Sequence, residues 1–526
     1  MKLLIILLTL VPLLILGQDP DPEILFTDLI ENALKGEEFI YGEHYSDPDI
    51  FVISDKKIII DEHYSYGGIM KYKSLKQEME KRLDPSLLKY KDDELIIPIF
   101  SFWESEFIMD DFVNLKLDSL YLMGLELNNC KGLQLLISNS TVEFFNASQI
   151  NSKGIRFNNC TFYGGLSLNI GLSIIDWFSI ADSEIYPNNN PRKFNPNTHT
   201  GDILFDSTYY HNFIPLTTFS YQANETRDFV LIRNKIITDS LGQQFNLSSN
   251  KFNNLRIEAN AINAYLNLNR TKINEKLIFL NNKINGFVSL NEFLYSELYN
   301  EIYWNQLDGE KIYLNVINNE TYTSPYFGKN EYELSDEVNF KRLLKVYQNL
   351  FQIYSNNGDL ESANGSYAEM KDVEERRLKY IYQQQGRFQN YFKWKLSRLL
   401  KMYTNHGTNP ALAVIVSIYV ILAFAVFYFF FPSEWDVTSK SKLIENYKDF
   451  IEKNDKGYAK PFIMMVLGFG ISLINALTLS LNSFTTLGFG TIPTKGLARY
   501  VCIIQGFIGW FLLSIFTVAL INQVLA

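Results

Sequence analysis

Polar and apolar positions recur with a short period between residues 115 and 290. A polar residue precedes an apolar one, as in Asn234-Lys235-Ile236 and Asn282-Lys283-Ile284, and a Leu-x-Leu-like alternation follows. The apolar positions 252, 262, 273 and 284 lie 10 or 11 residues apart. Two such intervals make a coil of about 20 residues whose inward side chains stack between turns. The pattern predicts a β-solenoid-like repeat domain over residues 111–330; a non-repetitive β-rich domain is the alternative.

Segments of different character flank these repeats. Residues 19–110 are expected to form a mixed α/β cap, because the first coil of a solenoid would otherwise expose its core. Residues 335–402 change to helical spacing, with Asn357-Gly358 as a stop signal and Asp359 as a new N-cap. This segment is therefore predicted to be a helical hairpin followed by a basic interfacial helix.

Three uncharged stretches occupy the C-terminal quarter. Residues 410–432 and 500–526 are each long enough to cross ~30 Å of hydrocarbon as a helix. The stretch between them, 461–494, is interrupted by Gly468, Gly470, Asn475 and Asn482. We expect two crossings with a re-entrant segment between them, including a short helix over residues 475–484, since irregular backbone is tolerated at membrane depth where it lines water. A third crossing by residues 461–481 is the alternative.

The chain begins with one lysine, an apolar stretch over residues 3–16 and an acidic, proline-containing flank. This stretch is shorter than the ~20 residues of a spanning helix. Residues 1–18 are therefore predicted to be a cleaved secretory signal peptide, or else an uncleaved N-terminal anchor.

The 526 residues carry a formal net charge of −10, unevenly distributed. From Arg387 onwards there are 13 basic and 6 acidic side chains, against 35 and 52 before it. An acidic body on a basic, apolar tail is typical of a water-exposed domain mounted on a membrane, and the acidic total argues against nucleic acid as a partner. The basic stretch before residue 410 is expected to contact anionic lipids through Arg387, Lys393, Trp394, Lys395, Arg398 and Lys401.

Residues for metal or nucleophilic catalysis do not form a recognisable motif. The sequence has no CxxC, no HExxH and no acidic pair that could be assigned to sugar chemistry. We therefore expect no enzyme activity and no cofactor. Cys130 and Cys160 share an Asn-Asn-Cys context and are expected to be buried thiols, with a bridge between them as the alternative if this region is exported.

Residues 483–493 read Ser-Phe-Thr-Thr-Leu-Gly-Phe-Gly-Thr-Ile-Pro. This run resembles the pore signature of the potassium-channel family, whose selectivity filter reads Thr-Val-Gly-Tyr-Gly. The order of features over residues 409–526 is also similar: a span, a polar linker, a pore helix ending at Thr485, the filter, a proline and a glycine-containing span. The resemblance implies a two-transmembrane pore domain whose filter is formed by Thr486, Leu487, Gly488, Phe489 and Gly490.

The resemblance also implies a mechanism and an assembly. Backbone carbonyls would replace the hydration shell of K⁺, namely those of Thr486, Leu487, Gly488 and Phe489. One pore loop per chain implies a homotetramer around one axis. Gly509 and Gly506 fall where the hinge glycine of the family lies, and close helix packing is the alternative role for both. Thr491 stands where the family usually has Asp, so the resemblance implies cation conduction more directly than strict K⁺ selectivity.

These expectations combine into a multi-domain integral membrane protein with a β-solenoid-like body, a helical hairpin and an α-helical pore domain. We expect a tetrameric potassium-selective or cation channel of the bacterial cytoplasmic membrane, gated under the influence of the repeat domain and its unknown ligand. Tyr367-Ala368-Glu369-Met370 resembles a run in the helix pair that follows pentapeptide-like repeats in some bacterial channel proteins. The alternative is a cell-envelope binding or adhesion module with a non-conducting, pore-like anchor.

The side of the membrane on which residues 19–400 lie is left open by the sequence. A cleaved signal peptide places them outside. The basic run before residue 410 and the channel resemblance place that flank inside.

Overall fold

The computed structural model divides the chain into two compact units, Met1–Asn357 and Gly358–Ala526. The structure describes residues 23–36, 50–60, 75–108, 115–163, 168–186, 217–237, 244–307, 312–314, 331–431, 441–442, 444–445, 447–448, 451–452, 459–486 and 497–525. The signal-peptide or anchor segment 1–18 lies outside these residues.

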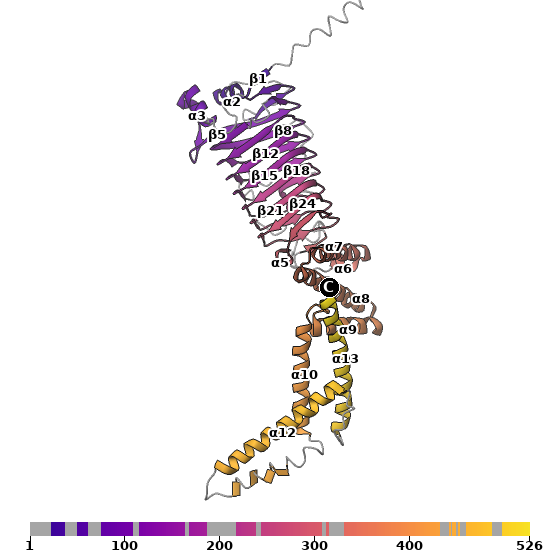
Figure 1. Ribbon diagram of the computed structural model, residues 1–526. Helices are drawn as coiled ribbons and strands as arrows, with labels where there is room; N and C mark the ends of the chain where they lie inside the picture. Colours follow the sequence, from indigo (N-terminus) through magenta and orange to yellow (C-terminus); the bar gives the residue numbers. More distant parts are fainter. Residues whose placement is uncertain are drawn as a thin grey trace, which may run out of the picture. The chain divides into compact units, whose positions relative to one another are not determined.

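The first unit is a β-solenoid, as the repeat pattern predicts (Figure 1). One face is an eight-stranded parallel sheet. Its strands in chain order are β7 (Leu115–Asp118), β9 (Gln134–Ser138), β12 (Asn151–Asn158), β15 (Ile174–Ala181), β18 (Glu225–Ile232), β21 (Lys251–Glu258), β24 (Lys272–Leu280) and β27 (Tyr299–Ile302).

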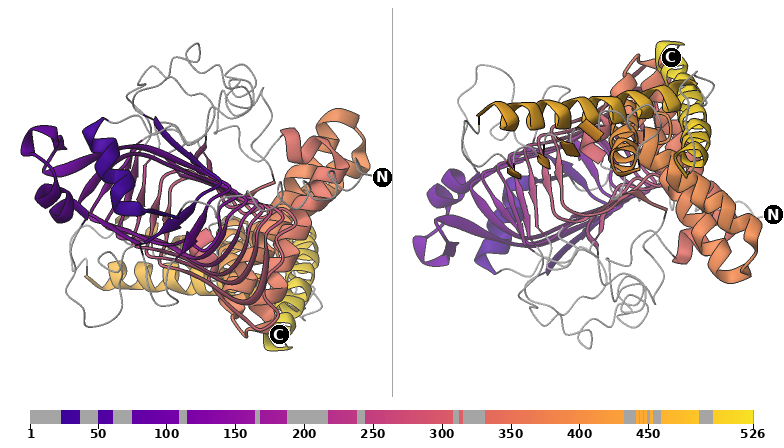
Figure 2. Two further views of the ribbon diagram at one scale, coloured as in Figure 1. Left: turned by 90° about the horizontal axis from the view of Figure 1, so that it is seen from above. Right: turned by 90° about the horizontal axis from the view of Figure 1, so that it is seen from below.

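Shorter strands form the two remaining faces. After the long strand β8 (Leu120–Asn128), which pairs with both β10 and β11, one face consists of β10 (Thr141–Val142), β13 (Thr161–Tyr163), β16 (Glu184–Tyr186), β19 (Lys235–Ile236), β22 (Ala261–Ile262) and β25 (Lys283–Ile284). The other consists of β11 (Phe145–Ser148), β14 (Leu168–Gly171), β17 (Thr217–Gln222), β20 (Gln244–Asn246), β23 (Tyr265–Asn267), β26 (Val288–Ser289) and β28 (Ile312–Tyr313). In the end-on view the coils lie over one another (Figure 2).

The coil length agrees with the predicted period of about 20 residues. Side-chain hydrogen bonds join equivalent positions 20, 22, 23 and 26 residues apart in successive coils. The four apolar positions that define the period, Phe252, Ile262, Ile273 and Ile284, are at most 3% exposed. Their stacking in the interior is therefore confirmed.

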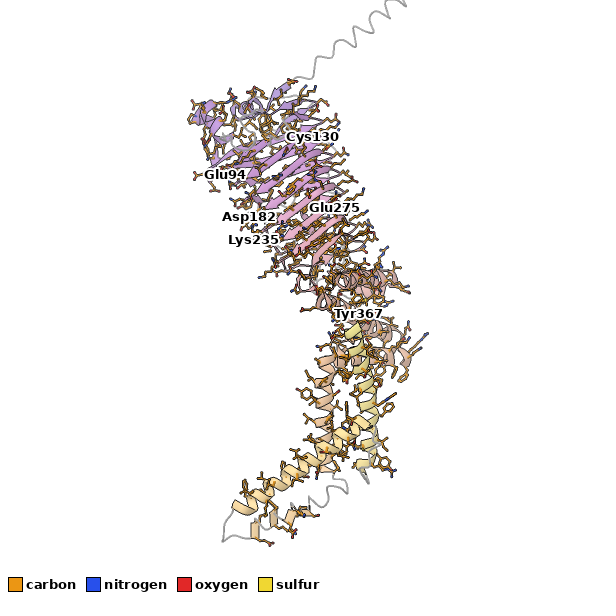
Figure 3. The ribbon with its side chains drawn as sticks, in the orientation of Figure 1. Glu94, Cys130, Asp182, Lys235, Glu275 and Tyr367 are labelled. Carbon is orange, nitrogen blue, oxygen red and sulfur yellow. The ribbon has the colours of Figure 1, made fainter. Side chains whose placement is uncertain are left out.

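Two corners of each coil share one construction, which explains the recurring polar residue. A residue in the left-handed conformation, such as Asn159 (φ 53°) or Arg233 (φ 54°), is followed by a small buried residue whose carbonyl accepts a hydrogen bond from the next coil. In Asn234-Lys235-Ile236 the asparagine makes the corner, the lysine points outward and the isoleucine inward. Asp182 and Lys235 follow each other along one edge of the solenoid (Figure 3).

Cys130 and Cys160 occupy such corner positions, and both are unbridged, buried thiols. Their backbones pair with different neighbours: the carbonyl of Cys130 accepts a hydrogen bond from the N–H of Asn151, and that of Cys160 from the N–H of Glu184. Burial raises the pKa of Cys130 to about 11 and that of Cys160 to about 12. Both side chains therefore act as small core residues, as expected.

The N-terminal end of the solenoid is covered by α2 (Phe26–Lys35) and α3 (Leu75–Arg82). Phe26, Ile30 and Leu75 line a small apolar cavity together with core residues of the first coils. Parallel pairing begins within the expected cap, because β2 (Ile50–Ser54) pairs with β5 (Glu94–Trp103) and β5 with β8. The remaining elements there are β1 (Glu23–Leu25), β3 (Lys57–Ile59), η2 (Pro85–Leu87), β4 (Tyr90–Lys91) and β6 (Glu106–Ile108).

Helices cover the other end of the solenoid. In α5 (Trp304–Leu307), Gln306 accepts a hydrogen bond from the backbone N–H of Asn282 at 2.8 Å. Trp304 packs edge-on against Tyr347 of α7 (Glu337–Asn356), which follows α6 (Glu331–Ser335). The predicted turn at Asn357-Gly358 is present, with Asp359 capping the next helix.

The second unit is helical. It contains α8 (Leu360–Gln385), α9 (Phe388–Thr404), α10 (Pro410–Phe430), α12 (Ala459–Thr486) and α13 (Leu497–Leu525). Helix α8 packs on α9, whereas α10, α12 and α13 pack on one another. By length and composition, α10, α12 and α13 could each cross a membrane, over Pro410–Phe430, Phe462–Thr485 and Leu497–Ile521.

Candidate pore segment and the helices that support it

The predicted filter falls mostly outside the described residues. Thr485 and Thr486 end α12, and the Thr485 hydroxyl donates to the carbonyl of Leu481 at 2.9 Å. The remaining filter residues, Leu487, Gly488, Phe489 and Gly490, lie in the segment 487–496 that joins α12 to α13 in the sequence and is not described.

The expected interruption of the stretch before the filter is absent. Helix α12 runs without a break through Gly468 and Gly470 to Thr486, so the short, separate pore helix over residues 475–484 is not present. A helical glycine costs only about 1 kcal/mol, and a helix satisfies its own backbone hydrogen bonds in an apolar environment. Three helices long and apolar enough to cross a membrane are therefore present where two crossings were expected.

A buried polar network joins the three long helices. The Tyr428 hydroxyl of α10 donates to Gln505 Oε1 of α13 at 2.8 Å. Gln505 Nε2 donates to the Ser480 hydroxyl of α12 at 2.7 Å and to the Ser480 carbonyl at 3.0 Å. All three side chains are at most 2% exposed. Sequence reasoning did not single out Gln505, although an amide in the middle of the uncharged stretch 500–526 was a signal for such a role.

Gly509 brings α13 close to the end of α12. A Cβ added at Gly509 would lie 2.1 Å from the carbonyl oxygen of Phe484, two residues before Thr486. Gly506, one turn earlier, is also buried. This contact gives Gly509 the close-packing role, while a hinge role for either glycine stays a prediction.

We expect Gly509→Ala to destabilise the helical unit by about 2–3 kcal/mol, because the methyl group forces α12 and α13 apart. Thermal unfolding of the full-length protein in a neutral detergent measures this. Gly470→Ala is the matched control, since its added Cβ meets no atom within 4 Å other than those of its own stretch of helix. Equal unfolding temperatures for the two variants would show that the contact at Phe484 does not limit packing.

The structure places the predicted lipid-contacting residues on α9 but engages two of them with α8. Lys401 pairs with Asp372 at 2.7 Å, and Trp394 Nε1 donates to Glu375 at 3.1 Å. The residues next to Lys401 in the sequence give no sign of this ion pair, because Asp372 lies on the preceding helix. Three others remain exposed on the surface, namely Arg387, Lys393 and Arg398.

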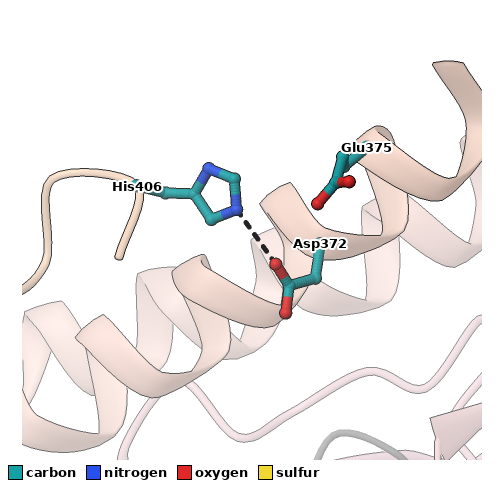
Figure 4. Close-up of side chains that lie close together, drawn as sticks. All are labelled: Asp372, Glu375 and His406. Atoms are coloured by element: carbon teal, nitrogen blue, oxygen red, sulfur yellow. Dashed lines mark hydrogen bonds and ion pairs between the residues drawn. The ribbon is translucent and has the colours of Figure 1, made fainter. Parts of the chain in front are cut away.

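Asp372, Glu375 and His406 form a cluster whose potential ligand atoms lie within 4.8 Å of one another (Figure 4). His406 Nε2 lies 2.9 Å from Asp372 Oδ1, and the Lys401 ammonium occupies Oδ2. Burial raises the pKa of Asp372, but the hydrogen bonds from His406 and Lys401 outweigh it and leave the pKa below its ordinary value. A carboxylate already paired with an ammonium group is a poor metal ligand, so this cluster is an ion network that fastens the α9–α10 turn to α8.

No family model, no curated protein and no solved structure matches the chain. The class of protein is therefore inferred from the architecture of the chain itself. The solenoid together with three helices capable of spanning a bilayer fits a membrane-associated protein.

Proposed function

We propose that the protein is a subunit of a homotetrameric cation channel, selective for K⁺, with a filter at residues 486–490. The observation that supports this most directly is the position of the Thr-Leu-Gly-Phe-Gly run. It begins at the last residue of α12 and precedes α13, two apolar helices that pack together through Phe484 and Gly509.

The proposed conduction uses backbone carbonyls rather than charged side chains. Carbonyls of residues 486–489 replace the water around the ion, and Gly488 and Gly490 permit the backbone conformations that point successive carbonyls inward. The C-terminal end of α12 lies directly before the filter, where its partial negative charge favours a cation. The Gln505 network fixes this end of α12 against α10 and α13.

The rest of the chain is proposed to regulate the pore. The solenoid offers a long surface for a ligand, and α9 contacts anionic lipid at the membrane surface through its basic side chains. A ligand that favours one state of the solenoid would shift gating by its difference in affinity for the two states.

Reconstitution of the purified full-length protein into planar bilayers tests this proposal. We expect discrete cation currents that reverse near the K⁺ equilibrium potential under a K⁺/Na⁺ gradient. Absence of current from protein shown to be tetrameric by mass measurement would contradict it. Absence of current together with binding of a carbohydrate or a protein by the solenoid would support the adhesion alternative.

Sidedness provides a second prediction. If the filter is re-entrant, α10 is the one crossing between the solenoid and residue 491, so Thr491→Cys should react with a membrane-impermeant maleimide from the side opposite to the solenoid. Protease accessibility of residues 19–400 in intact cells identifies the side of the solenoid. If Thr491→Cys reacts from the same side of the membrane as the solenoid, α12 crosses the membrane completely, which contradicts a re-entrant pore.

A further inference from the structure

A groove with a volume of about 580 Å³ lies between α8 and α9 in the second unit, with the beginning of α10 at one end. Its lining is unusual in charge, with four basic and two acidic side chains. The lining residues are Asp372, Glu375, Arg376, Lys379, Trp394, Arg398, Lys401, Met402, Asn405 and Leu412.

The charges of this groove are not balanced internally. Lys401 is neutralised by Asp372 at 2.7 Å, and Glu375 accepts a hydrogen bond from Trp394. Within the described part of the chain, no hydrogen bond or ion pair engages the charged groups of Arg376, Lys379 and Arg398. Because Glu375 keeps its negative charge, the groove carries a net charge of +2, and its three unpaired cationic groups are open to an anion from outside the unit.

The arrangement of these groups suits an anion with several oxygen atoms. Arg376 and Lys379 are three residues apart on α8, and Trp394 and Arg398 are four apart on α9, so each pair shares one helix face. Both faces line the same groove. Two guanidinium groups can each donate a pair of parallel hydrogen bonds to phosphate oxygens, and the lysine adds a third positive charge.

We propose that this groove binds a phosphate-bearing group through Arg376, Lys379 and Arg398. Such a group could belong to an anionic phospholipid or to a soluble phosphorylated compound. The apolar edge of the groove fits the lipid, because Met402 is 65% exposed and Leu412 is the third residue of the apolar helix α10. The site would couple occupancy to the α9–α10 turn, and it does not depend on whether the protein conducts ions.

Calorimetric titration of the full-length protein in a neutral detergent tests this site. The probes are dioctanoyl phosphatidic acid, inorganic phosphate and dioctanoyl phosphatidylcholine, whose phosphate is masked by choline. We expect the double variant Arg376→Gln, Arg398→Gln to weaken binding of the phosphate probes at least tenfold, since each guanidinium makes charge-assisted hydrogen bonds. The milder pair Arg376→Lys, Arg398→Lys keeps the charge and should give an intermediate loss.

The matched control is Arg342→Gln, Lys345→Gln, two exposed cations three residues apart on α7. It removes the same charge outside the groove and should leave affinity unchanged within about twofold. Binding of phosphatidic acid alone assigns the site to lipid, and binding of inorganic phosphate as well assigns it to the phosphate group itself. No binding of either probe, or an equal loss in the α7 control, overturns the proposal.

Discussion

Replacing Gly488 by Asp should abolish cation current through the reconstituted protein while leaving its oligomeric state intact. The proposed filter requires a backbone conformation at this position that a residue with a Cβ resists. The new carboxylate would also displace the carbonyl ligands from the ion path. The measurement is single-channel current in planar bilayers, with mass determination of the purified variant as the check on assembly.

Thr491→Asp is the matched control for this experiment, because it introduces the same carboxylate three residues further along. At that position the charge lies beyond the carbonyl ligands, where it attracts cations to the pore entrance. We expect current to persist and its cation selectivity to be unchanged or higher. Undiminished current in Gly488→Asp, or loss of current in both variants alike, would contradict the assignment of the filter.

The solenoid could be predicted from sequence because single inward-facing apolar residues recur at a fixed spacing along the chain. The interior accepts apolar side chains at Phe252, Ile262 and Ile273, so their 10- or 11-residue spacing reports the coil length directly. The left-handed corner residues could not be predicted in this way. Leu172 and Arg233 adopt φ near +54° at corner positions where some other coils have asparagine. Hydrogen bonds from adjacent coils there outweigh the local preference of each residue.

The membrane-capable helices were harder to predict from sequence. Glycines in α12 suggested a break, yet glycine can lie in an open helix surface, as at Gly470, without ending the helix. The groove of α8 and α9 depends on which helix faces meet, and sequence spacing on one helix does not determine that. For the same reason the ion pair between Lys401 and Asp372, 29 residues apart, had no local signal.

Asn260→Ala should destabilise the solenoid by about 3–5 kcal/mol, a large effect for one small side chain. Asn260 is 2% exposed and stands in a ladder between Asn234 and Asn282. The side-chain oxygen Oδ1 of Asn260 accepts a hydrogen bond from the backbone N–H of Asn234 at 2.9 Å. Its side-chain nitrogen Nδ2 donates to the backbone carbonyl of Leu231 at 2.9 Å. Alanine removes these bonds and leaves several buried polar groups unsatisfied, which costs about 1–3 kcal/mol for each group.

The loss should be local as well as large, because each coil of a solenoid contacts mainly its neighbours. Urea unfolding of the full-length protein measures the destabilisation, and amide hydrogen exchange should show the greatest loss of protection in strands β18, β21 and β24. Asn274→Ala is the matched control, since Asn274 donates one exposed hydrogen bond to Asn253 at 2.9 Å. It should change stability by less than about 0.5 kcal/mol. If both variants unfold at the same urea concentration, the corner ladder does not carry the cohesion between coils that its geometry implies, and the backbone hydrogen bonds of the sheets and apolar stacking hold them together.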